Sequence, residues 1–157
     1  DDCVWLDKQP SGFHVMPWHP SLRIWEDTFE TLKPSFTNIE ATKNSIGKWQ
    51  LGSSQANTHS AFYCGVARPL KHVYFLETNS TDEIEIKSVT TQEAVISLLS
   101  HRFLLDISNK EVLSGDIKSI SALANAAACF RLCVPSNFDA LPDIRSRIVA
   151  HTNGKPL

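Results

Sequence analysis

The 157-residue sequence predicts an α/β domain in which helices flank a mixed sheet. Apolar runs of strand length alternate along the chain with segments of helical periodicity, and turn signals separate them. The composition, with 42% hydrophobic and 20% charged residues, is that of a globular protein. A chain of this length falls in the single-domain range. We therefore expect residues 1–157 to belong to a single domain.

The first elements are expected to form a hairpin. Residues 3–6 are apolar enough for a buried strand. Gln9–Gly12, with the sequence Gln-Pro-Ser-Gly, are a turn signal. The chain can then return as a second strand over Phe13–Met16.

A helix and a long irregular segment follow the hairpin. Apolar residues at helical spacing predict a helix over Leu22–Leu32, with Ser21 as its N-cap and Pro34 as its stop. Residues 33–60 are rich in Thr, Asn, Ser and Gly, which predicts an irregular loop region. A short strand over Gly47–Leu51 is expected to interrupt it.

Strand patterns recur in the second half of the chain. The nearly continuous apolar run His72–Leu76 predicts a central strand covered on both faces, followed by a turn over Thr78–Asp82. Ile84 and Ile86 alternate with polar residues, as in a strand with one exposed face. A further strand is expected over 130–134.

Helix signals separate and follow these strands. Thr90 and Glu93 have the spacing of a capping box that opens a helix. Ser114 is expected to cap a second helix, and Asp139 a last one in which Leu141 faces inward.

The bulk properties exclude several classes of protein. A formal net charge of −2 argues against a protein whose main work is binding nucleic acid. The sequence contains no run of 18 apolar residues, so it predicts no membrane span, and it has no signal-peptide pattern. Four irregularly spaced cysteines are too few for a disulfide scaffold. Reduced thiols in a cytoplasmic protein are expected instead.

The chain opens on two adjacent carboxylates, Asp1 and Asp2, directly before the first strand. Such a pair suits phosphoryl transfer, because one carboxylate can accept the proton of the acceptor hydroxyl while its neighbour helps to hold magnesium. The alternative is a solvated terminus without a role. Since the chain passes at once into a strand-like run, we expect residues upstream to belong to the same domain.

An ordered succession of motifs extends over nearly the whole chain. It consists of DD-x-V-x-L, V-M-P-x-x-P-S-L-R-I-W-E-D, R-P-L-x-x-V-Y-F-L-E, T-x-x-E-A-V-x-x-L-L-x-H-R-F and F-D-A-L-P. This succession resembles the HPr-kinase-like family of P-loop kinases. It is most similar to the HPr-kinase-related proteins of bacterial operons, such as kinases of lasso-peptide precursors. The resemblance implies a mixed sheet with flanking helices of the HPr-kinase/PEP-carboxykinase type, incomplete at its N-terminus.

The same resemblance implies roles for three residues, and a fourth candidate, Lys48, lies in the irregular segment 33–60. Asp1 matches the general base toward a serine hydroxyl and Asp2 the residue that supports the metal, although the two roles could be exchanged. Arg68 matches an active-site arginine that neutralises charge on the transferred phosphoryl group. Lys48 is a candidate for contacting the phosphates of ATP or the acceptor. For Arg68 and Lys48 the alternative is an ordinary exposed side chain.

Two departures from the family pattern limit what the resemblance implies. The sequence contains no G-x-x-x-x-G-K-[ST] motif, so the phosphate-binding loop is expected upstream. It also lacks the glycine-rich stretch that HPr kinase/phosphorylases carry before the central strand. The resemblance therefore does not extend to HPr as substrate or to dephosphorylation.

Together these features predict part of a kinase that uses ATP and Mg²⁺ to phosphorylate a serine of a peptide or small protein. Two alternatives stay open, a non-catalytic regulatory or binding module of the same fold and a kinase for a small metabolite. An incomplete sheet would leave an unpaired edge near 72–76, so the isolated chain is expected to aggregate or to need a partner, for example in a homo-oligomer.

Overall fold

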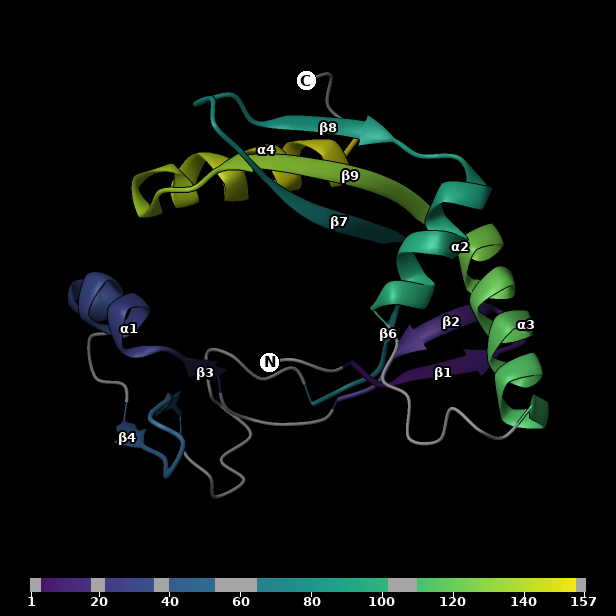
Figure 1. Ribbon diagram of the computed structural model, residues 1–157, viewed down its shortest axis with the longest axis horizontal. Helices are drawn as coiled ribbons and strands as arrows, with labels where there is room; N and C mark the ends of the chain where they lie inside the picture. Colours follow the sequence, from purple (N-terminus) through teal and green to yellow (C-terminus); the bar gives the residue numbers. More distant parts are fainter. Residues whose placement is uncertain (1–3, 18–21, 36–39, 53–64, 102–109, 155–157) are drawn as a thin grey trace. The chain divides into compact units, whose positions relative to one another are not determined.

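The computed structural model describes residues 4–17, 22–35, 40–52, 65–101 and 110–154 (Figure 1). These residues form four α-helices and three small three-stranded sheets, which is a mixed α/β fold. The sequence predicts one domain, and the chain is arranged in two compact units, residues 1–69 and residues 70–157. Each unit is described by itself.

The first unit begins with the expected hairpin. Strand β1 (Leu6–Gln9) pairs antiparallel with β2 (Gly12–Val15), and β2 also pairs with the short strand β6 (Arg68–Pro69). The hairpin is confirmed, but the prediction of a buried strand over residues 3–6 is wrong for its described part. Val4 and Trp5 are 66% and 59% exposed, because they precede β1.

The predicted helix over residues 22–32 is shorter than expected. Leu22–Ile24 form strand β3, and helix α1 spans Glu26–Leu32 with Trp25 at its N-cap. The first turn of the predicted helix is a strand instead, because it pairs antiparallel with β5 (Trp49–Leu51). The backbone of β5 supplies hydrogen bonds that the end of a helix would lack. Ser21, the predicted cap, lies outside the described residues.

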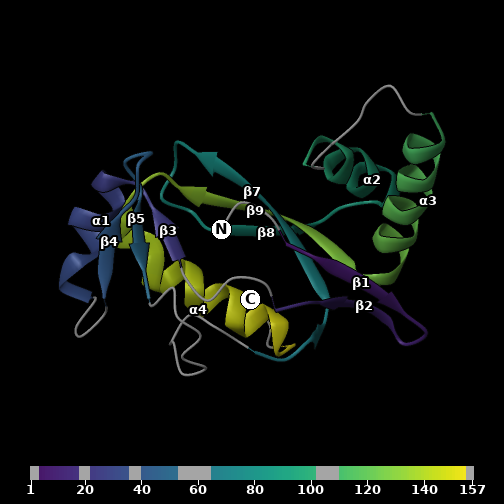
Figure 2. The same ribbon diagram turned by 90° about the horizontal axis from the view of Figure 1, so that it is seen from below.

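The segment 33–60 contains more regular structure than the sequence predicts. A 3₁₀ turn, η1 (Lys33–Ser35), contains Pro34 and follows the end of α1, as expected. Strand β4 (Ala41–Lys43) was not predicted, whereas the strand β5 was. The three strands form a sheet in the order β3-β5-β4, with α1 beside it (Figure 2). Leu51 of the middle strand is fully buried.

The second unit is built on a sheet of three strands, β7 (His72–Asn79), β8 (Glu85–Ser88) and β9 (Ala128–Pro135). Their order is β7-β9-β8, with β9 parallel to β7 and antiparallel to β8. The prediction that 72–76 is the central strand is wrong. Strand β9 occupies that position because it hydrogen-bonds to both neighbours, and Leu76 of β7 is 66% exposed.

Two strand predictions in this unit hold in outline. β9 contains the predicted strand 130–134. β8 contains Ile86 as predicted, but its burial does not alternate, because Glu85 and Ile86 are both half-buried whereas Lys87 and Ser88 are both exposed. The turn expected over Thr78–Asp82 starts later, because β7 continues to Asn79. There the Asn79 side-chain amide donates a hydrogen bond to the Glu83 carbonyl at 2.9 Å and so closes the bend.

Helix α2 (Thr91–Ser100) begins with the predicted capping box. The Thr90 hydroxyl accepts a hydrogen bond from the Glu93 amide at 3.3 Å, and the Glu93 carboxylate accepts one from the Thr90 amide at 2.8 Å. The Thr90 amide and, at 2.8 Å, the Thr90 hydroxyl both donate to the Glu93 carboxylate, and they hold the pKa of Glu93 below its ordinary value because they favour the charged form.

The other two helices begin at residues that the sequence did not identify. Helix α3 (Lys110–Ala126) starts one turn before the predicted cap Ser114. Helix α4 (Leu141–Thr152) has Ala140 at its N-cap and not the predicted Asp139, and no side chain caps it. Asn137 caps the preceding 3₁₀ turn, η2 (Phe138–Ala140), where its side-chain oxygen accepts a hydrogen bond from the amide of Ala140 at 2.9 Å. Leu141 is 40% exposed, so its predicted inward position is also wrong.

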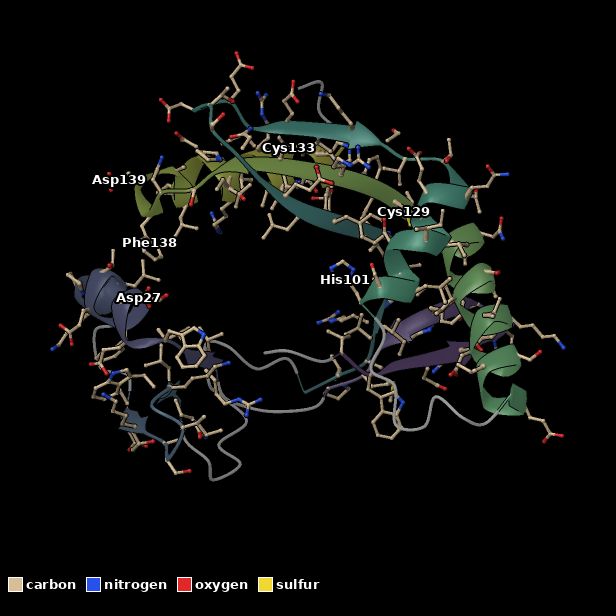
Figure 3. All side chains as sticks on the ribbon, viewed as in Figure 1. Asp27, His101, Cys129, Cys133, Phe138 and Asp139 are labelled. Atoms are coloured by element: carbon tan, nitrogen blue, oxygen red, sulfur yellow. The ribbon has the colours of Figure 1, made fainter. Side chains whose placement is uncertain are left out.

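The helices cover opposite faces of the β7-β9-β8 sheet. On one face, a small core joins β9 to α2 and α3, which lie side by side where β9 begins (Figure 1). Its buried members are Ala94, Ala124 and Cys129. Cys133 lies farther along β9 and is half-buried (Figure 3). Alternation along the strands places Tyr74 and Phe130 on the other face, against α4.

Replacing Thr90 by alanine should lower the free energy of unfolding by about 1 kcal/mol, because the orphan amide of Glu93 loses its acceptor. Urea denaturation followed by circular dichroism measures the change. Thr91→Ala is the matched control, since Thr91 is exposed at the first helical position. Equal stabilities for the two variants would show that the capping box contributes nothing.

Candidate functional site

The acidic pair cannot be placed relative to other residues. Asp1 and Asp2 lie outside the described residues, which begin at Val4. The hairpin that follows the pair is described, and its strand pairing extends to a hydrogen bond from the Met16 amide to the Trp5 carbonyl at 2.9 Å. The acidic pair therefore stays a prediction from the sequence.

Arg68 lies on β6, at the edge of the β1-β2-β6 sheet. It is directly opposite Val15 in the antiparallel pairing with β2. The Arg68 side chain is exposed. Exposure fits both an arginine that contacts a substrate and an ordinary solvated arginine.

Lys48 lies at the end of a tight turn between β4 and β5. The Asn44 side-chain oxygen accepts hydrogen bonds from the amides of Ile46 and Lys48, both at 3.0 Å. Gly47 has a φ of +86°, a conformation that side chains other than glycine rarely adopt. The turn thus fixes the backbone at Lys48. Its ammonium lies 4.9 Å from the centroid of the Trp25 ring, which is cation–π geometry.

The structure therefore places the two described candidates in different sheets of the first unit. Arg68 belongs to the β1-β2-β6 sheet, whereas Lys48 leads into β5 of the other sheet. The ammonium of Lys48 contacts an indole rather than a glycine-rich phosphate cradle.

One face of the β3-β5-β4 sheet packs against α1. Phe29 of the helix stacks on Trp49 of β5 with ring centroids 4.1 Å apart. Lys43 of β4 forms an ion pair with Glu26, and its ammonium also lies 5.8 Å from the Trp49 centroid. The hydrogen bond from Lys43 holds the pKa of Glu26 below its ordinary value, because it favours the carboxylate.

The opposite face of this sheet carries a different set of side chains, which we call the open face. Strand alternation and the cross-strand register define its members. They are Arg23, Trp25, Thr42, Lys48 and Gln50. Trp25 is 55% exposed, and Arg23 and Thr42 are exposed as well. Two cationic residues, Arg23 and Lys48, thus share this face with a partly exposed indole.

In the part of the chain that the structure describes, no three His, Cys, Asp or Glu side chains are grouped so that they could hold a metal ion. Magnesium prefers oxygen ligands from carboxylates and phosphates. Asp2, the residue predicted from the sequence to support the metal, lies outside the described residues.

A groove in the second unit has the wrong charge for a phosphate ligand. Its volume is about 730 Å³, and it lies between residues 82–85 and helix α4. Its charged lining consists of Asp82, Glu83, Glu85, Asp143 and Arg147. Four carboxylates against one guanidinium would repel an anion.

A histidine and tyrosine pair in the second unit has a structural role. The Tyr74 hydroxyl lies 2.7 Å from Nδ1 of His151, which is on the last turn of α4. Phe130 contacts the same imidazole edge-on, with centroids 4.4 Å apart. Burial raises the pKa of Tyr74, so the phenol stays protonated. This cluster attaches α4 to the sheet.

Comparison of the chain with protein-family models, with curated proteins and with solved structures found no match. None of the helices in the described ranges has the length and apolar character needed to cross a membrane.

Reasoning from the sequence missed the open face. Arg23 falls within the helix predicted over residues 22–32, where it would have no relation to Gln50 or Lys48. The apolar-polar-apolar order of Leu22, Arg23 and Ile24 was the available signal, since period two indicates a strand. That stretch is too short for the signal to outweigh the helical spacing that follows it.

Replacing Lys43 by glutamine should raise the pKa of Glu26 toward its ordinary value, because the main donor to the carboxylate is lost. In the native protein the stabilisation by this pair is present above the unfolded pKa of Glu26 and is lost as the pH falls through the lower folded pKa. NMR titration of the Glu26 side chain measures the shift. Lys8→Gln, in the other sheet of the first unit, should leave it unchanged. An unaltered Glu26 titration in the Lys43 variant would contradict this account.

Proposed function

We propose that this chain is part of an ATP-dependent kinase that transfers a phosphoryl group to a serine of a peptide or small protein. The observation that carries the proposal is the order of motifs along the sequence, from the acidic pair at residues 1–2 to F-D-A-L-P at residues 138–142. Each motif is loose by itself, but their order and spacing together resemble HPr-kinase-like proteins.

The observed helices and strands support this proposal at the level of fold class. A mixed α/β fold with a parallel strand pair is compatible with a P-loop kinase. The motif R-P-L-x-x-V-Y-F-L-E lies on β6 and β7, the capping box opens α2, and F-D-A-L-P spans η2 (Phe138–Ala140) and the start of α4. Motifs and regular elements thus coincide.

In the proposed reaction Asp1 accepts the proton of the serine hydroxyl while that oxygen forms a bond to the γ-phosphorus. The bond between the γ-phosphorus and the bridging oxygen breaks, and ADP leaves with its electron pair. Arg68 neutralises the negative charge on the transferred group. Bound Mg²⁺, supported by Asp2, would supply further charge neutralisation for the phosphates.

One observation favours a second candidate, a binding module of the same fold without catalysis. The sequence contains no G-x-x-x-x-G-K-[ST] motif to hold the triphosphate. The sequence encoded upstream discriminates the two candidates. An intact phosphate loop there supports the kinase, and a disrupted one supports the binding module.

Asp1→Asn in the full-length protein should lower phosphoryl transfer by about 10²- to 10⁴-fold, because the amide cannot accept the serine proton. Transfer of labelled phosphate from ATP with Mg²⁺ to a library of serine peptides measures the rate. The matched control is Asp139→Asn, since Asp139 is exposed on η2 (Figure 3) and carries the same charge. A normal rate in the Asp1 variant would remove Asp1 from the mechanism.

Arg68→Gln should reduce kcat by roughly 10²-fold with little change in the KM for the acceptor, because the guanidinium acts on charge that develops in the transition state. Steady-state kinetics with the best peptide of the library separates the two constants. Arg145→Gln on α4 is the control, since Arg145 is also exposed. A change in KM alone would mean that Arg68 binds the acceptor and does not stabilise the transition state.

A further inference from the structure

Strand β7 lies at an edge of the sheet in the second unit (Figure 1). It pairs with β9 on one side, and no strand in the described ranges pairs with its other side. An edge of this kind presents a row of backbone N–H and C=O groups that can hydrogen-bond to a further strand. The two edges of this sheet differ in the features that normally prevent such pairing.

The other edge strand, β8, has the usual protection against strand addition. It is four residues long, and the exposed Lys87 on it pairs with Glu85. Short edge strands and lysine side chains both discourage pairing. Strand β7 is eight residues long, contains no Lys, Pro or Gly, and pairs with β9 at eight consecutive positions without a bulge. The edge of β7 therefore favours the addition of a strand.

The backbone of β7 determines which residues would form the new hydrogen bonds. The Lys71 carbonyl accepts a hydrogen bond from the Ala128 amide at 2.9 Å, so the backbone groups of Lys71 point toward β9. Because this direction alternates along a strand, the odd-numbered residues of β7 bond to β9. The N–H and C=O groups of His72, Tyr74 and Leu76 then point to the open edge.

Apolar side chains along β7 are incompletely covered. Leu76 is 66% exposed, and Val73, Tyr74 and Phe75 are half-buried. Side chains that lie directly opposite each other on paired strands approach to about 5 Å. An added strand would thus satisfy the outward backbone groups and also remove apolar surface from water.

The charges near the two ends of β7 indicate that the added strand is β7 of a second copy. Two copies can pair antiparallel about a twofold axis at Tyr74, which places Lys71 of one copy opposite Glu77 of the other. The symmetry forms this pair twice. Lys71 is exposed, and the Glu77 side chain is 51% exposed. Glu77 Oε1 already lies 3.0 Å from Arg131 Nε, and a carboxylate with about four lone-pair sites can accept an ammonium as well.

The same register suits the other side chains of β7. It places Val73 opposite Phe75 of the second copy, and the exposed Leu76 opposite His72. A shift by two residues in either direction keeps the outward backbone groups opposite each other, but it places Lys71 opposite Asn79 or Phe75 and loses the ion pair. Complementary charge therefore selects the register that is centred on Tyr74.

We infer that this chain forms a dimer through β7, whose open edge pairs antiparallel with β7 of a second copy around Tyr74, while Lys71 of each copy binds Glu77 of the other. The two sheets then form one continuous sheet. Both β7 edges are used, and only the protected β8 edges stay outside, so the assembly stops at the dimer. The inference does not depend on the proposed kinase activity.

Sedimentation equilibrium of the full-length protein over a range of concentrations measures the dissociation constant. Lys71→Glu and Glu77→Lys should each weaken the dimer by roughly tenfold, because like charges then face each other at both symmetry-related positions. An equimolar mixture of the two variants should dimerise more tightly than either alone, since each contact again joins a lysine to a glutamate. Unfolded variants could not restore pairing in this way. Lys118→Glu, the same charge change at an exposed position of α3, should have no effect.

Amide hydrogen exchange shows whether β7 is the strand that pairs. The amides of Tyr74 and Leu76 should exchange roughly tenfold more slowly in concentrated than in dilute protein, because only the dimer covers them. The amides of Val73 and Phe75 serve as the internal control, since they bond to β9 and should be protected equally at both concentrations.

Three results would overturn the inference. The first is a full-length protein that stays monomeric, in which protection of the Tyr74 and Leu76 amides would show that another segment of the same chain covers the edge. The second is a dimer whose dissociation constant is the same for Lys71→Glu as for the native protein. The third is assembly beyond the dimer, which a closed twofold pairing does not allow.

Discussion

The parallel pairing of β7 with β9 constrains the rest of the second unit. Parallel strands cannot be joined by a tight turn, so the chain between residues 79 and 128 has to return to the starting end of the sheet. It uses this length to add β8 on the far side of β9 and then α2 and α3. Strand β9 consequently carries buried residues of this unit's sheet, such as Leu132 and Val134 at 4% and 6% exposure.

Local signals predicted the second unit well wherever the determining atoms are close in sequence. The capping box of Thr90 and Glu93 is an example, because both partners lie within one turn. The sequence could not predict that β9 is the central strand and β7 an edge strand, since both segments are apolar runs. Only the backbone pairing between segments far apart in the chain decides which strand is central. In the η2 turn before α4, Asn137 and Asp139 are equally good caps by residue type, and only the backbone geometry gives Asn137 the capping hydrogen bond.

In the first unit the sequence predicted individual residues of interest but not their grouping. Lys48 was singled out by its place in an irregular segment. Its neighbour Trp25 was read as part of a helix, because the apolar spacing over residues 22–32 outweighs the short alternation at its start. The two residues are 23 positions apart, and a strand pairing that no local pattern encodes places them together. The composition of the open face thus depends on which residues of β3 and β5 pair with each other.

The turn from Asn44 to Lys48 therefore determines more than a loop conformation. Because side chains alternate along β5, a one-residue insertion or deletion between Gly47 and Trp49 that shifts the register of β5 would exchange the two faces of the strand. Trp49 and Leu51 would then point to solvent, and Lys48 and Gln50 toward Phe29 of α1. Changes of two residues preserve the alternation. In homologous chains this turn should vary in length by even numbers, so the parity of its length is an evolutionary signature of the open face.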